Sequence, residues 1–94
     1  MALARVVSFD GVPGERVAEM REEIGRAEPP EGLRATELLV LHDPAAERSL
    51  VLVFFDDEEA YARGDEILDA MSAQDTPGRR TSVTRYDVVV RRSV

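Results

Sequence analysis

Hydrophobic and polar positions along the chain predict four strands and two helices. The most distinct stretch is SLVLVFFDDEEAY, residues 49–61, in which an apolar run passes directly into acidic residues. Residues 50–55 are apolar at both alternating sets of positions, so this strand is expected to be covered on both faces and central in its sheet. Asp56 is then expected to cap a helix, with Glu59 three residues later completing a capping-box-like pair.

The rest of the pattern supplies the other elements. It predicts a strand over residues 3–9, a helix over about 13–27, a strand over about 33–42, a helix over about 57–72 and a last strand over about 81–91. In both helices, apolar residues recur at spacings of three and four, which gives each helix one apolar stripe. Gly64 lies in the second stripe, where glycine is unfavourable, and it predicts either close approach of another backbone or room for a bound molecule.

This order of elements predicts a ferredoxin-like α+β fold, βαββαβ, in a single domain over residues 1–94. Right-handed crossovers place the first and third strands side by side in the centre of a four-stranded antiparallel sheet, with both helices on one face. The other face would then be apolar and bare. We therefore expect it to be buried against a second copy, giving a sheet-to-sheet homodimer that forms a dimeric α/β barrel.

Composition and charge exclude several classes of function. The chain has no cysteine, which excludes disulfides, thiolate zinc sites and cysteine nucleophiles. A net charge of -7 opposes binding to nucleic acid, and the apolar runs are too short to cross a membrane. The first residues lack the apolar core of a signal peptide, so a cytoplasmic location is expected.

Two polar residues stand out as candidates for chemistry. Arg5 lies on a largely apolar face of the first strand, either as a guanidinium at a sheet or dimer edge paired with a carboxylate, which we favour, or as an anion anchor in a pocket. His42, at a strand end, could act as a general base or metal ligand. A metal site needs several ligands, however, so we expect no metal and no catalytic residue here.

The run from Pro30 to Tyr61 resembles the dimeric α/β-barrel family that includes the antibiotic biosynthesis monooxygenases and their haem-degrading relatives. The shared pattern is a proline and a glycine before the second strand, then an aromatic residue followed by acidic or polar residues, an alanine and a helical aromatic residue. Phe55, Ala60 and Tyr61 match it in this chain. The resemblance implies the same fold and a pocket between the sheet and the helices.

That pocket would be lined by Val51, Val53 and Phe55 from the third strand and by Tyr61 and Gly64 from the second helix. Where the monooxygenases carry a tryptophan and an asparagine, this chain has Phe55 and Val51, and it contains neither residue type anywhere. We therefore expect a protein that binds a small apolar or aromatic molecule without a cofactor. The alternatives are a monooxygenase-like enzyme with a divergent active site and a non-binding structural or regulatory dimer.

Overall fold

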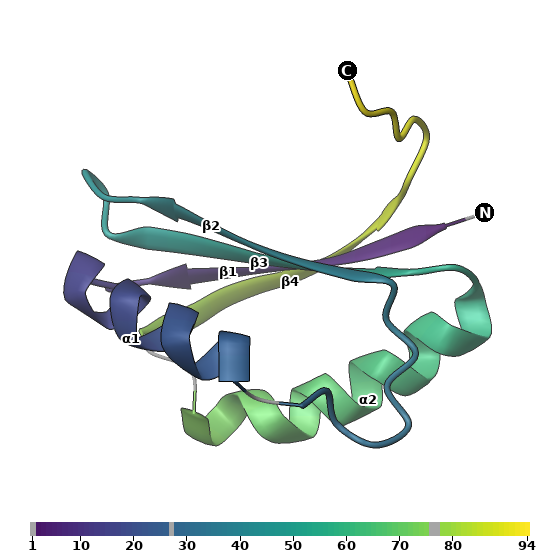
Figure 1. Cartoon of the computed structure of the whole chain (residues 1–94), viewed down its shortest axis with the longest axis horizontal. Helices are drawn as coiled ribbons and strands as arrows, with labels where there is room; N and C mark the ends of the chain where they lie inside the picture. Colours follow the sequence, from purple (N-terminus) through teal and green to yellow (C-terminus); the bar gives the residue numbers. More distant parts are fainter. Residues whose placement is uncertain (1, 27, 76–77) are drawn as a thin grey trace.

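The computed structural model describes residues 2–26, 28–75 and 78–94 of the chain. Its elements are β1 (Leu3–Asp10), α1 (Gly14–Arg26), β2 (Glu37–Asp43), β3 (Arg48–Phe55), α2 (Glu58–Asp75) and β4 (Arg79–Asp87). The strands form one antiparallel sheet in the order β2-β3-β1-β4, and both helices lie on the same face of it (Figure 1). The predicted ferredoxin-like fold is confirmed.

Strand β3 is interior to the sheet, as its apolar run predicts, because it pairs with β1 on one side and with β2 on the other. Alternation along the strand sends successive side chains to opposite faces. Val53 and Phe55 pack with Ala60 and Tyr61 of α2 and therefore face the helices. Leu50, Leu52 and Phe54 consequently point to the open face, which is the face that carries no helix.

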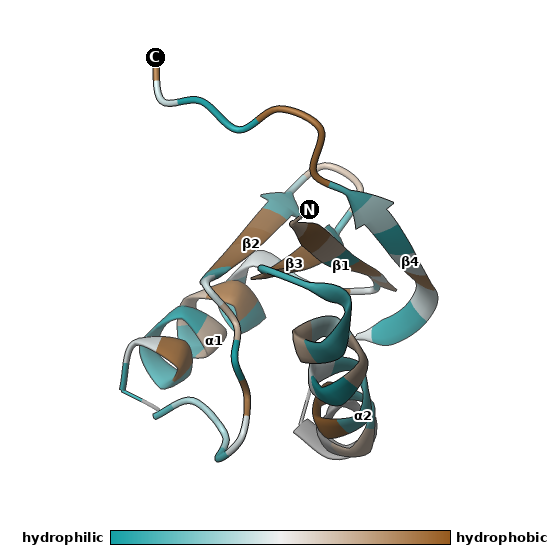
Figure 2. Cartoon of the chain, turned by 90° about the vertical axis from the view of Figure 1, so that its right-hand side faces the viewer, coloured by the Kyte–Doolittle hydropathy of each residue, from teal (hydrophilic) through white to brown (hydrophobic). Residues whose placement is uncertain are grey.

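The core on the helix side consists of two separate clusters. The larger cluster, beneath α2, contains Leu3, Val53, Phe55, Ala60 and Tyr61. The smaller cluster contains Val7, Phe9 and Val12, with Val17 of α1 packed against it. Figure 2 shows the reason for this division: α1 lies beneath the β2 side of the sheet, and α2 lies beneath the β4 side.

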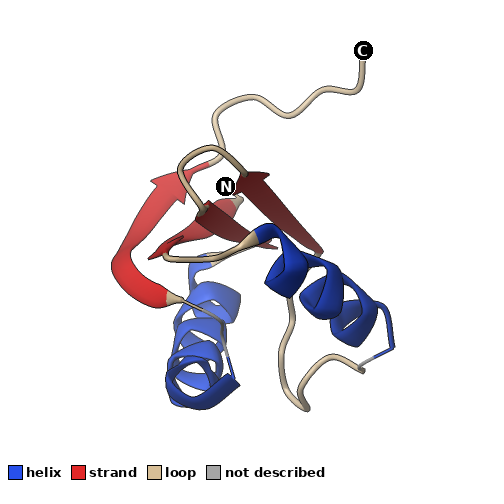
Figure 3. Cartoon of the chain, turned by 90° about the vertical axis from the view of Figure 1, so that its left-hand side faces the viewer, coloured by secondary structure: helices blue, strands red, loops and turns tan. Residues whose placement is uncertain are grey.

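The same separation of the two helices is visible from the opposite side (Figure 3). Helix α1 has no buried residue along its whole length. Val51, in the middle of interior strand β3, packs against both core clusters but is itself only half-buried. The helix layer therefore covers β1 and β3 well beneath α2 and covers the sheet less well beneath α1, while β4 is exposed along its whole length.

Element ends differ from the predicted ones for local physical reasons. The cap of α2 is Asp57, not Asp56, because the Asp57 carboxylate accepts a 2.8 Å hydrogen bond from the backbone N–H of Ala60. Strand β2 begins at Glu37, since the preceding segment turns at Gly32, where φ is 84°. Strand β4 ends at Asp87, which is paired with Leu3, the first residue of β1; one further backbone hydrogen bond runs from Val88 N–H to the carbonyl of Ala2.

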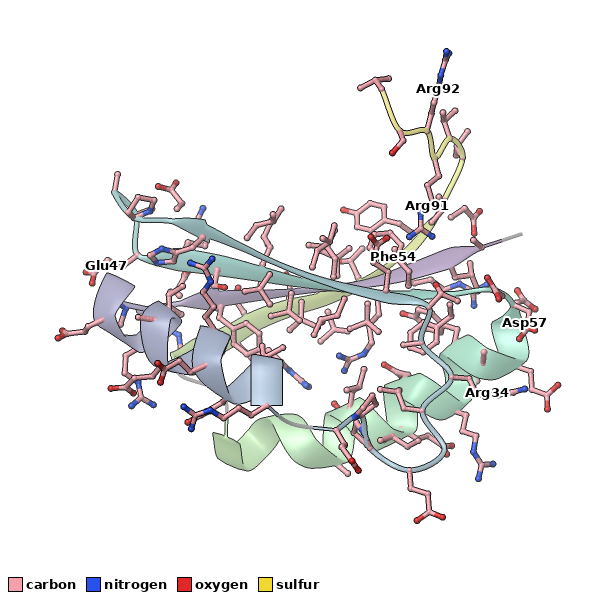
Figure 4. The ribbon with its side chains drawn as sticks, in the orientation of Figure 1. Arg34, Glu47, Phe54, Asp57, Arg91 and Arg92 are labelled. Carbon is pink, nitrogen blue, oxygen red and sulfur yellow. The ribbon has the colours of Figure 1, made fainter. Side chains whose placement is uncertain are left out.

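The open face of the sheet is apolar and partly covered by the C-terminal segment. Leu39, Leu41 and Tyr86 are exposed on it. The chain after β4 rises above this face, where the Arg91 guanidinium lies over the Phe54 ring at 4.9 Å from its centroid and forms an ion pair with Glu37 (Figure 4). Within the described part of the chain, no helix has the length and apolar character needed to cross a membrane.

Candidate functional site

Arg5 is a buried charge on the helix-facing side of the sheet. Its side chain is 4% exposed, and its Nε donates a 2.8 Å hydrogen bond to Asp65 of α2. Burying a guanidinium is costly unless it is paired, and Asp65 supplies that pairing. The carboxylate partner agrees with our favoured interpretation, but Arg5 does not lie at an edge, because β1 is an interior strand.

One nitrogen of this guanidinium lacks a partner. Arg5 Nη2 is buried and has no hydrogen-bond acceptor among the residues that the structure describes. A buried donor without an acceptor costs about 1–3 kcal/mol. The fold therefore retains Arg5 Nη2 as an unfavourable buried donor, and a hydrogen-bond acceptor supplied by another molecule would remove this cost.

Tyr61 at the start of α2 is packed on two sides. Its ring meets Phe55 edge to face, with centroids 5.6 Å apart, and the Arg85 guanidinium lies 5.3 Å from its centroid. Burial raises the pKa of the Tyr61 hydroxyl above 10.0, and Asp65 raises it further, although Arg5 and Arg85 act in the opposite direction. Tyr61 is therefore a protonated hydrogen-bond donor at neutral pH and not a base.

Arg85 of β4 holds its position through Glu58 at the start of α2. Its Nη2 donates a 2.6 Å hydrogen bond to the Glu58 carboxylate, and this bond raises the pKa of Arg85 above its ordinary value. In the sheet, Arg85 is paired directly with Arg5. Two guanidiniums and one tyrosine from three distant parts of the chain thus share one side of α2.

Gly64 marks a close contact with Phe55. A Cβ atom added at Gly64 would lie 2.3 Å from Cε1 and 2.4 Å from Cζ of the Phe55 ring. Of the two interpretations of this glycine, close approach describes its surroundings better, although the neighbour is a ring and not a backbone. Phe55 itself is fully buried, so the space beside Gly64 is filled by the protein's own side chain.

The less covered part of the helix side lies between α1 and the sheet. Leu38 of β2 faces the helices yet is 44% exposed, and Val40 and Val51 are only half-buried. Opposite them, the apolar stripe of α1 is also accessible, with Met20 half-buried and Ile24 41% exposed. We call this surface the α1 slot; its residues are Val17, Met20, Ile24, Leu38, Val40 and Val51.

A hollow of about 550 Å³ lies elsewhere on α1 and is lined by Glu19, Glu22, Glu23 and Arg26. The spacing of these residues places them on the face of α1 opposite its apolar stripe. All four are exposed, and their charge suits solvent better than an apolar molecule. This hollow is therefore separate from both the α1 slot and the cluster around Arg5.

Comparison with known proteins identifies a solved structure with a similar fold. No protein-family model matches the chain, and no curated protein sequence matches it significantly. Among solved structures, it is similar to a crystal structure from Chloroflexus aurantiacus J-10-fl that is assigned as an antibiotic biosynthesis monooxygenase, with a TM-score of 0.64 over 99% of this chain and 98% of that chain. The fold is antibiotic biosynthesis monooxygenase-like. Sequence identity is 14%, so the likeness establishes the fold alone.

Within this monooxygenase-like fold, the residues predicted from the sequence fall into separate groups. Val53, Phe55, Tyr61 and Gly64 are buried together beneath α2, whereas Val51 lies between the two clusters and borders the α1 slot. Asp65, Arg85 and the slot residues of β2 were not predicted. Alternation along β2 placed Leu38 and Val40 on one face, but nothing in the sequence indicates that α1 leaves them accessible.

His42 has a structural position in the monooxygenase-like fold. Its Nε2 lies 2.8 Å from the carbonyl oxygen of Val12, to which the Nε2–H tautomer donates a hydrogen bond. Val12 is in turn held by its backbone N–H, which donates to the carbonyl of Glu47. His42 is at the Ser49 end of the sheet, whereas the polar cluster lies at the Phe55 end. Within the described residues, no group of three metal-ligating side chains is present.

Proposed function

We propose that this protein is a homodimer that binds a small apolar or aromatic molecule in the α1 slot, without carrying out cofactor-free oxygenation. The observation that carries the proposal is the accessibility of Leu38, Val40 and Val51, which face the helix layer and should be core if α1 closed onto the sheet. Contiguous accessible apolar surface of this kind is typical of binding sites. Because the Phe55 ring fills the space beside Gly64, we propose that the binding site lies beside α1 and not beside Phe55.

The chemistry of the lining supports binding more than catalysis. The slot is aliphatic, and the nearby polar residues are engaged: Arg5 with Asp65, and Arg85 with Glu58. Tyr61 stays protonated at neutral pH because burial raises its pKa. None of these residues is a ready general base.

The apolar open face supports the homodimer. Leu39 and Leu41 are 41% and 49% exposed there, and Tyr86 is 55% exposed. Val89 and Val90 beyond β4 are also exposed, which adds apolar surface beside the same face. Burying these side chains against a second copy would remove them from water. A cytoplasmic location and the absence of nucleic-acid and membrane partners stay predictions from the sequence.

Titration with a neutral aromatic compound tests the ligand-binding proposal. We expect naphthalene-2-carboxamide to bind the wild-type protein, as measured by calorimetry, and we expect Ile24→Gln to weaken that binding because it places a polar group in the slot. Glu22→Gln is the matched control, since it changes an exposed residue on the other face of the same helix. If the wild-type protein does not bind, or if both variants bind equally well, the α1 slot is not the site.

A monooxygenase-like enzyme with a divergent active site is the second candidate, favoured by the polar cluster of Arg5, Tyr61 and Arg85. Oxygen consumption with a panel of quinols tests it. We expect no turnover, because the tryptophan and asparagine positions of the resembling family hold Phe55 and Val51. Turnover that is abolished by Tyr61→Phe would favour the enzyme. A protein that neither binds nor turns over would remain a structural or regulatory dimer.

A further inference from the structure

The unpartnered nitrogen of Arg5 indicates which chemical group a ligand would present. A guanidinium carries five N–H donors in a rigid planar fork, which matches the geometry of anionic oxygen groups such as a carboxylate. Asp65 takes the Nε side of this fork, at 2.8 Å. Buried Nη2 is left without an acceptor among the described residues, so the Arg5 fork is only partly used.

The charges around Arg5 favour an anion over a neutral acceptor. The countercharge on Asp65 is 46% exposed, so water screens it, while the Arg5 side chain is almost fully buried. The neighbouring Arg85 guanidinium is paired with Glu58, whose side chain is 80% exposed. Arg85 is itself 47% exposed, so Arg5 is the buried positive group of the cluster, and its countercharge on Asp65 is the more exposed partner.

The arrangement of the sheet connects this cluster to the α1 slot. On the helix-facing side, Arg5 is paired with Val53, and the next helix-facing pair along these two strands is Val7 with Val51. Val51 belongs to the slot, so an apolar body lying on Val51 has its nearest buried cation at Arg5. Val53 and Val7 between them are apolar and buried.

We propose that Arg5 is the anchor for the carboxylate of an apolar or aromatic acid whose body lies in the α1 slot. Nη2 donates to the carboxylate while Nε keeps its hydrogen bond to Asp65. This inference rests on the proposed binding function and adds the ligand class to it. Charge-assisted hydrogen bonds are the strong ones, so the anchor gives the site a preference for acids.

A pair of compounds that differ only in charge tests the anchor. Naphthalene-2-carboxylate and naphthalene-2-carboxamide are titrated by calorimetry at neutral pH into wild type, Arg5→Gln and Arg16→Gln. We expect the wild-type protein to prefer the carboxylate by about tenfold, the size expected for one hydrogen bond to a charged group. Arg5→Gln should abolish the preference and still bind the carboxamide. Arg16→Gln, which removes an exposed guanidinium from α1, should keep the preference.

The outcomes separate this inference from the proposed function. Equal wild-type affinity for the two compounds, or a preference that persists in Arg5→Gln, overturns the anchor but leaves the slot. No binding of either compound to the wild-type protein overturns both. If Arg5→Gln does not fold, as judged by circular dichroism, Asp65→Asn decides: it keeps an acceptor for Nε but removes a competing negative charge, so the carboxylate preference should increase. An unchanged or smaller preference in Asp65→Asn overturns the anchor.

Discussion

Replacing Gly64 by alanine should destabilise the protein, although alanine is the better helix former. The new Cβ would lie 2.3 Å from Cε1 of Phe55, more than 1 Å inside the contact distance of about 3.5 Å between carbon atoms. Phe55 is fully buried and cannot move into solvent. Overpacking of this kind costs up to about 3 kcal/mol, and the helix propensity gained offsets about 1 kcal/mol, so we expect a net loss of about 2 kcal/mol in the free energy of unfolding.

The measurement is thermal or urea unfolding at one fixed protein concentration, because the stability of the proposed dimer would depend on concentration. For a domain of this size, a loss of about 2 kcal/mol lowers Tm by roughly 8–16 °C. Gly25→Ala is the matched control: nothing lies within 4 Å of its Cβ, so it should be neutral or stabilising by up to about 1 kcal/mol. If Gly64→Ala is as stable as the wild type, the space beside Phe55 is open and the reasoning about the filled pocket is wrong.

Three further predictions follow from the core, the open face and the helix cap. The free energy of unfolding should fall as pH rises above about 10, because the pKa of Tyr61 is higher in the folded state than in the unfolded state. Tyr61→Phe should remove this part of the decline, and an identical pH profile in the variant would contradict the prediction. Leu52→Asp should convert the dimer to monomers in equilibrium sedimentation, whereas a monomeric wild type would refute the dimer itself. Asp57→Ala should cost about 1 kcal/mol in urea unfolding and Asp56→Ala much less, because Asp57 accepts the capping hydrogen bond; a larger cost for Asp56→Ala would favour the cap predicted from the sequence.

The fold could be predicted from the sequence because its main signals are local. Apolar residues on both alternating faces of residues 50–55 require an interior strand, and the direct change to acidic residues marks the start of a helix. The end of β4 could not be read in this way. Residues 88–90 continue the apolar pattern, but a strand also needs a partner; β1 begins opposite Asp87, and the pairing continues by one hydrogen bond, from Val88 to Ala2.

The candidate site was predicted only in part, because it depends on contacts between distant residues. Asp65 is 60 positions from Arg5, and no spacing in the sequence indicates that these two side chains meet. The cost of glycine in a helix marked Gly64 as unusual, but only the structure identifies the ring of Phe55 as its neighbour. The accessibility of Leu38 depends on where α1 lies over the sheet, which is a property of packing and not of any local pattern.

The Arg91 contact on the open face has a consequence for assembly. Its guanidinium covers the Phe54 ring and pairs with Glu37, so the C-terminal segment occupies part of the surface on which a second copy would dock. Dimerisation would then replace the contacts of the C-terminal segment on this face with contacts to the second copy. An exposed cation–π contact and a surface ion pair are each worth at most about 1 kcal/mol, and salt weakens the ion pair. Raising the ionic strength should therefore loosen this cover and favour the dimer. Salt also screens the repulsion between two copies that each carry a net charge of -7, which favours the dimer as well.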